Sequence, residues 1–264
     1  MLVKRIFTSL FLIAMISGVI FFDWLCGAVV TIFIVGGLYE FFSMLEKKGI
    51  SPYKYFGIAM GIIIPISIMF RFELTKGWEL LFIVIALAFL ILMQFKRRKN
   101  LGSIVDISTT IFGIIYVSWF FSFLIKIRYM DNGLGYLAAV LLITKAGDIG
   151  AFLIGSRFGK QPFMPRISPK KTMEGSCGGI FFNILAGLAA KPLLGFSYPQ
   201  LIVLSICVGI LGQLGDLSES MMKRDCGVKD SGNVFPGMGG VLDEIDSLLF
   251  IVPVFYFYMS VALK

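Results

Sequence analysis

The chain has 264 residues, of which 58% are hydrophobic and 15% are charged, and its mean hydropathy is +0.90. Soluble domains carry about 45–50% apolar and about 25% charged residues, so the composition excludes an ordinary soluble protein. The net charge of +8 lies in short stretches between apolar segments rather than in one basic region. This distribution indicates an orientation across a membrane and argues against nucleic acid as a partner.

Nine apolar segments follow one another along the chain, and most have the length that a helix needs to cross about 30 Å of hydrocarbon. They predict an all-α, polytopic integral membrane protein with one catalytic domain over 1–264. Five spans occupy about 1–130, and the catalytic spans and loops occupy about 131–264. The expected spans are Ile6–Phe22, Trp24–Ser43, Phe56–Phe70, Gly77–Phe95, Ile107–Ile125, Leu134–Ile154, Gly178–Ala190, Leu201–Gly215 and Val241–Leu263.

The basic residues of the loops predict the topology. With a cytoplasmic N-terminus and alternating spans, 17 lysines and arginines fall inside and 6 fall outside. Cytoplasmic loops hold the excess of these residues, so this orientation is expected. The two longest loops, about 155–177 and 216–240, then lie together on the cytoplasmic side.

The residue types limit the chemistry of any active site. There is no histidine, and the four cysteines have no paired spacing. Histidine-based general-base catalysis and zinc sites are therefore excluded. Any reaction must use carboxylates, hydroxyls, lysines or a metal ion.

In the sixth span, Lys145 and Asp148 stand at i and i+3. Ionisable residues within a membrane segment indicate a functional site by default. The alternative is a structural pair that neutralises its own charge between helices.

The loop after the sixth span carries hydroxyl and ammonium groups close together, at Ser168, Lys170, Lys171 and Thr172. Such donors suit the phosphate groups of a nucleotide. The alternative is a basic loop that only anchors the topology.

Acidic residues gather near the end of the chain, where seven of the sixteen lie between Asp216 and Asp246. One helical face would carry, at i, i+3, i+4 and i+7, Asp216, Glu219, Ser220 and Lys223. A glycine-rich connector then leads to Asp243 and Asp246, again at i and i+3. Clustered carboxylates without histidine or paired cysteine suit Mg²⁺, a hard ion that prefers oxygen ligands. The alternative is a solvated helix end whose acids pair with Lys223, Arg224 and Lys229.

The run from Ser220 to Asp246 resembles the signature of the phosphatidate cytidylyltransferases, or CDP-diacylglycerol synthases, S-x-x-K-R-x4-K-D-x-G-x3-P-G-H-G-G-x2-D-R-x-D. The matched positions are Ser220, Lys223, Arg224, Lys229, Asp230, Gly232, Pro236, Gly237, Gly239, Gly240, Asp243 and Asp246. The S-P-K-K-T-x-E-G element of the family is matched from Ser168 to Gly175, and its intramembrane aspartate is matched at Asp148.

Two positions depart from that signature. Met238 stands where the pattern has His, and Glu244 stands where it has Arg. Either the chain neutralises phosphate charge with Lys223, Arg224 or Lys170 instead, or its activity is altered.

The resemblance implies a nucleotidyltransferase of phospholipid biosynthesis that makes CDP-diacylglycerol and pyrophosphate from CTP and phosphatidate. Asp216, Asp243 and Asp246 are expected to hold Mg²⁺, with Glu219 nearby and with a second metal or a monovalent ion left open. Catalysis is assigned to Lys223, Asp243, Asp246 and Asp148. Substrate binding is assigned to Ser168, Lys170, Lys171, Thr172, Ser220, Arg224, Lys229 and Asp230.

The expected setting is a bacterial inner membrane, with membrane lipids around the protein, the active site facing the cytoplasm, and a homodimer suggested by the 29 glycines. Three alternatives remain open. The chain could be a CTP-dependent kinase or a cytidylyltransferase acting on another membrane lipid, a transporter with an ion path through Lys145, Asp148 and Asp216, or an inactive relative of the synthases.

Overall fold

The structure, a computed structural model, describes residues 18, 22–70, 76–96 and 102–262. Most of the described chain is helical, which confirms the predicted all-α class. The elements are α2 (Asp23–Lys47), α3 (Lys54–Met69), α4 (Lys76–Phe95), α5 (Ser103–Gly113), the π-helical η1 (Ile114–Trp119), α6 (Phe120–Arg128), α7 (Gly133–Phe158), β1 (Pro162–Met164), β2 (Ser168–Thr172), α8 (Met173–Ala189), α9 (Lys191–Leu194), α10 (Tyr198–Asp225) and α11 (Val241–Ala262).

Five of the described helical segments are long and apolar enough to cross a membrane, and three further apolar helices are shorter. The five are Trp24–Lys47, Ser103–Arg128, Gly133–Phe158, Tyr198–Asp225 and Val241–Ala262. This arrangement fits the predicted polytopic membrane protein. The first expected span, Ile6–Phe22, lies almost wholly outside the described residues.

The helices at the seventh and eighth expected spans extend beyond those spans. α8 begins at Met173 rather than Gly178, and α10 continues past Gly215 to Asp225. The apolar pattern stops at Gly215 because the last turns of α10 are polar, yet they remain helical. The loops expected over 155–177 and 216–240 therefore shrink to a β-hairpin between α7 and α8 and to the connector 226–240.

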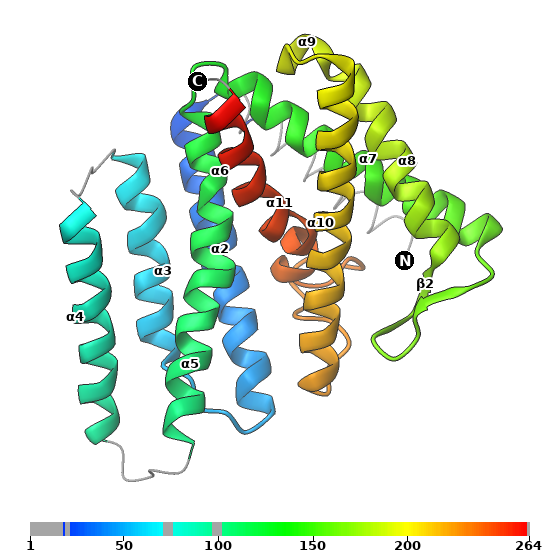
Figure 1. Ribbon diagram of the computed structural model, residues 1–264. Helices are drawn as coiled ribbons and strands as arrows, with labels where there is room; N and C mark the ends of the chain where they lie inside the picture. The colour runs from blue at the N-terminus through cyan, green and yellow to red at the C-terminus, as the bar shows by residue number, and fades with distance from the viewer. Residues whose placement is uncertain (1–17, 19–21, 71–75, 97–101, 263–264) are drawn as a thin grey trace.

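The helices form two groups joined through α11 (Figure 1). α2, α3, η1 and α6 pack together, and α4 lies at the outer edge, where Phe89 stacks on Phe56 of α3. α7 and α8 pack closely along their length, and α10 contacts both α8 and α11. α11 also contacts α2 and α6, and its Phe255 is among the most fully buried side chains. The second group carries the site described below.

Two contacts between helix ends fit the expected alternation of the spans, with α5, η1 and α6 forming one continuous segment. At one end of the bundle, Lys48 after α2 forms an ion pair of 2.5 Å with Asp225 at the end of α10. At the opposite end, the Asn132 side chain before α7 donates a hydrogen bond of 2.8 Å to the carbonyl of Leu193 in α9. The loops that the charge count assigns to one side thus meet at one end of the molecule.

Candidate active site

A cavity of about 800 Å³ lies among α7, α8, α10, the first turns of α11 and the β-hairpin. Its volume is typical of a small-molecule site. Four lysines and six carboxylates line it, at Lys145, Lys170, Lys171, Lys223, Asp148, Asp216, Asp230, Asp243, Glu244 and Asp246. Because formal negative charges exceed positive ones by two, the lining electrostatically favours a divalent cation or further basic groups.

Ten residues that the sequence predicts for the site line this one cavity, namely Asp148, Ser168, Lys170, Lys171, Thr172, Asp216, Lys223, Asp230, Asp243 and Asp246. Four predicted residues lie outside its lining, namely Glu219, Ser220, Arg224 and Lys229. The structure therefore brings together the intramembrane aspartate, the hairpin and the acidic segment, which are far apart in the chain.

The β-hairpin is held against the start of α8. The Glu174 carboxylate accepts hydrogen bonds from the backbone N–H groups of Lys160 (3.1 Å) and Gln161 (3.2 Å). Hydrogen bonds from its own backbone N–H and from those of Lys160 and Gln161 lower the pKa of the Glu174 carboxyl. Thr172 caps α8 by accepting from the N–H of Gly175 at 3.2 Å. These bonds order the strand that carries Lys170 and Lys171.

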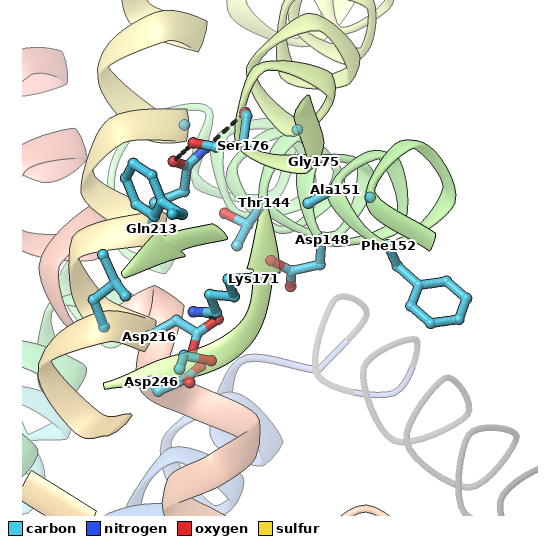
Figure 2. A pocket seen from close by; sticks show the side chains of 18 of the residues that line it. Thr144, Asp148, Ala151, Phe152, Lys171, Gly175, Ser176, Gln213, Asp216 and Asp246 are labelled. Atoms are coloured by element: carbon cyan, nitrogen blue, oxygen red, sulfur yellow. Dashed lines mark hydrogen bonds and ion pairs between the residues drawn. The ribbon is translucent and has the colours of Figure 1, made fainter. Parts of the chain in front are cut away.

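Three elements bring charged groups together in the cavity. Lys171 from β2 forms an ion pair with Asp216 of α10. Figure 2 shows Asp246 of α11 beside this pair and Asp148 of α7 pointing into the same space. The charges of Asp216, Glu219 and Asp148 all act on Asp246. Like charges this close repel one another unless a cation lies among them.

Lys223 is the centre of a second group of charges. Its ammonium pairs with Asp243 Oδ1 at 2.5 Å and with the fully buried Glu219. Two carboxylates thus hold one ammonium at the edge of the cavity. In this arrangement Glu219 and Asp243 serve first to fix Lys223.

Asp243 also caps α11, in which it is the third residue. Its Oδ2 accepts hydrogen bonds from Gly240 N (2.7 Å), Ser231 N (3.0 Å) and Ser231 Oγ (2.8 Å). The backbone N–H of Gly240 lies at the start of α11 and has no partner within the helix. Its hydrogen bond to the Asp243 side chain is one of the two bonds of a capping box. The connector reaches this position through Gly239, whose φ of +115° favours glycine.

Glu40 of α2 caps the same helix end from a distant part of the chain. The carboxylate is buried and accepts 2.9 Å hydrogen bonds from Val241 N, Leu242 N and Ser231 Oγ. From the sequence, Glu40 could be interpreted only as a cap or as a residue reaching the interface. A Cβ atom added at Gly240 would collide with the Glu40 carboxylate. The glycine-rich connector therefore makes room for this buried acid.

Three of the predicted residues outside the lining support the walls of the cavity or face away from it. Arg224 donates hydrogen bonds to the carbonyls of Ile167 (3.3 Å) and Val228 (3.2 Å), which joins the hairpin to the connector. Ser220 Oγ donates to Asp216 Oδ1 at 3.4 Å. Lys229 is exposed on the connector. Their roles in substrate binding stay predictions.

Several polar residues of the lining were not predicted from the sequence. Gln213 of α10 donates a 2.9 Å hydrogen bond from Nε2 to the Ser176 carbonyl of α8, and the two side chains also bond to each other (Figure 2). Thr144 and the buried Asn183 line the cavity between helices. The sequence feature that could have identified these residues is a polar side chain within an apolar segment. Such a residue faces a cavity or another helix rather than lipid.

Gly175, Gly178 and Gly179 of α8 face α7. A Cβ on Gly175 would lie 3.0 Å from the carbonyl oxygen of Ala151. Small residues of this kind let helices pack closely in membranes. They bring Asp148 of α7 toward the hairpin.

The carboxylates of the cavity offer Mg²⁺ only part of a ligand shell. Among the residues that the structure describes, no three acidic, histidine or cysteine side chains are placed as a ready ligand set. Mg²⁺ commonly takes only one or two protein carboxylates and completes its shell with waters and substrate phosphates. Asp216 and Asp246, which interact in the cavity, offer such a partial set. That Asp216, Asp246, Asp243 and Glu219 bind the metal stays a prediction.

Comparison with known proteins identifies the family. The model of the cytidylyltransferase family matches residues 3–262. The chain belongs to the cytidylyltransferase family. The phosphatidate cytidylyltransferase of Synechocystis is 32% identical, and the match covers 98% of this chain and 97% of the relative. That of Bacillus subtilis is 32% identical over 84% of each chain, and that of Staphylococcus aureus is 39% identical over 64% of this chain and 65% of the relative.

Membership of the cytidylyltransferase family confirms the resemblance drawn from the two sequence elements. Both positions that depart from the signature, Met238 and Glu244, line the same cavity as the matched residues. The differences therefore fall inside the site rather than at its periphery.

Proposed function

We propose that this chain transfers CMP from CTP to phosphatidate and releases pyrophosphate, and its relatives are named phosphatidate cytidylyltransferases. One observation carries the proposal. Both signature segments and Asp148 line one cavity, and three of the helices around it, α7, α10 and α11, are long and apolar enough to cross a membrane. Such a cavity can receive a lipid from the bilayer and a nucleotide from water.

The proposed chemistry needs no strong protein base. An oxygen of the phosphatidate phosphate, already anionic, attacks the α-phosphorus of CTP, and the bond to the β-phosphate breaks. The protein then contributes positioning and neutralisation of charge. Lys170 and Lys171 on the hairpin and Lys223 on α10 are the ammonium groups suited to the phosphates. This accounts for catalysis in a chain without histidine.

Mg²⁺ would be held by Asp216 and Asp246, with Asp148 facing them. When bound, the ion supplies positive charge to the phosphate oxygens, which lowers the repulsion between two anionic substrates. Lys171, paired with Asp216, is placed to move between this carboxylate and a phosphate.

The proposed location is a bacterial inner membrane with the cavity at the cytoplasmic face. Two facts support it, namely the excess of lysine and arginine in the loops at the cavity end and the bacterial source of the relatives. A homodimer remains part of the proposal.

The test follows the label of CTP in detergent-lipid micelles with purified protein, phosphatidate and Mg²⁺. Label from the α-phosphate should enter the lipid, and label from the γ-phosphate should appear in pyrophosphate. Transfer of the γ-phosphate to lipid would instead identify a CTP-dependent kinase. If folded protein transfers neither label to any lipid offered, the proposal is wrong, and a transporter or an inactive relative becomes the better account.

A further inference from the structure

Lys145 is the cavity lysine that neither signature element contains. It lies near the middle of the 26-residue α7, which is long and apolar enough to cross a membrane. A lysine at such a depth is costly, so it needs acidic neighbours or a function. Its ammonium lies 3.5 Å from Asp148 Oδ2, one turn along the same helix. The pair is thus within one helix and does not tie two helices together.

The Lys145–Asp148 pair is open to the cavity. Their side chains are 41% and 49% exposed, and both line the cavity. A purely structural ion pair in a membrane helix would be sealed from water and well bonded, because desolvation makes a loose pair expensive. The exposure indicates that Lys145 can meet a bound molecule.

Glu244 on α11 and Lys145 on α7 line the same cavity. The acids whose charge acts on Lys145 are Asp148, Glu244 and Asp246, and Lys145 is the cation that acts on Glu244. Position 244 is the one at which the family signature has Arg. In this chain an acid stands at that position, and Lys145 lines the same cavity.

The other basic residues are poorly placed to replace that Arg. Arg224 lies outside the cavity lining and donates to backbone carbonyls, and Lys223 is held by Glu219 and Asp243. Lys170 and Lys171 lie on the hairpin, a different wall of the cavity from α11, and Lys171 pairs with Asp216. Lys145 lines the same cavity as Glu244 and is the basic group whose charge acts on it.

We propose that Lys145 is a substrate-positioning residue that supplies, from α7, the positive charge that the family signature places at position 244 on α11. Its ammonium binds a phosphate group of the bound substrates, and Glu244 with Asp148 orients it. A charge-assisted hydrogen bond of this kind raises affinity for an anionic phosphate. The phosphate can belong to CTP or to phosphatidate, and the experiment distinguishes them.

The experiment moves the positive charge from position 145 on α7 to position 244 on α11. kcat/KM is measured for CTP and for phosphatidate in wild type, Lys145→Met and the double variant Lys145→Met, Glu244→Arg. We expect Lys145→Met to lose about 10- to 100-fold in kcat/KM, and the double variant to recover most of it. The substrate whose KM rises more is the one whose phosphate Lys145 binds.

Controls separate this inference from the proposed function on which it rests. Lys191→Met removes one charge outside the cavity, where Lys191 lies 3.5 Å from the Tyr198 ring centre, and it should leave kcat/KM unchanged. Failure of the wild type to make CDP-diacylglycerol would overturn the proposed function itself. If the wild type is active, a Lys145→Met protein of normal activity, or a folded double variant as inactive as the single one, overturns the role of Lys145. Lys145→Gln replaces Lys145→Met if the latter does not fold.

Discussion

Two aspartates three residues apart on α11 have different surroundings and should respond differently to the same change. Asp243 accepts from three donors and pairs with Lys223, whereas Asp246 lies among other acids and accepts from its neighbour Ser247 N. In EDTA we expect Asp243→Asn to lower the free energy of unfolding by about 1–3 kcal/mol, because the capping and ion-pair interactions are lost. Asp246→Asn should not destabilise the protein, since it removes a repelling charge.

Thermal unfolding in detergent checks this difference, with activity measured on the same samples. Both variants should lose activity. Equal destabilisation of the two proteins in EDTA would show that Asp246 is also structural. Unchanged stability of Asp243→Asn would show that its hydrogen bonds contribute little.

Single residues also show where sequence reasoning stopped. The i, i+3, i+4 and i+7 spacing correctly places Asp216, Glu219 and Lys223 near one another on a helix. This spacing does not predict that Asp216 lines the cavity whereas Glu219 is fully buried beside Lys223. Neighbouring helices decide which edge of a helical face meets the cavity, and that information is not local.

At the scale of elements, the N-terminus of α11 depends on α2. Glu40 satisfies two N–H groups of α11 and also accepts from Ser231. We expect Glu40→Gln to reduce stability by about 1–3 kcal/mol and to reduce activity, because the amide donors would face N–H groups that need an acceptor. The melting temperature and the rate of CDP-diacylglycerol formation measure both effects.

Glu46→Gln is the matched control on the same helix. Glu46 is exposed and pairs with Lys54 at 3.2 Å, so its loss should cost at most about 1 kcal/mol. If Glu40→Gln behaves like Glu46→Gln, the Glu40 cap does not support the site. The sequence could predict the helices from their apolar lengths. It could not predict this cap, because the two partners are 201 residues apart.

At the scale of the whole molecule, the alternation of the described helices predicts which loops share a side. In a protein whose native cysteines are replaced, a cysteine at position 160 should react with an impermeant maleimide from the cytoplasmic side. A cysteine at position 131, between α6 and α7, should react from the other side. Both positions are exposed. Labelling of both from the same side would contradict the topology that the loop charges indicate.

The central claim is that Asp216 and Asp246, with Mg²⁺, form the part of this membrane cavity where CMP is transferred. The most direct measurement is the rate of CDP-diacylglycerol formation as Mg²⁺ is varied, for wild type, Asp246→Asn and the control Asp225→Asn, whose exposed carboxylate pairs with Lys48. We expect the wild type to be inactive in EDTA, Asp225→Asn to match it at every Mg²⁺ concentration, and Asp246→Asn to lose at least about 100-fold even at saturating Mg²⁺. Full wild-type activity in EDTA, or Asp246→Asn activity within a few-fold of wild type, would contradict the account.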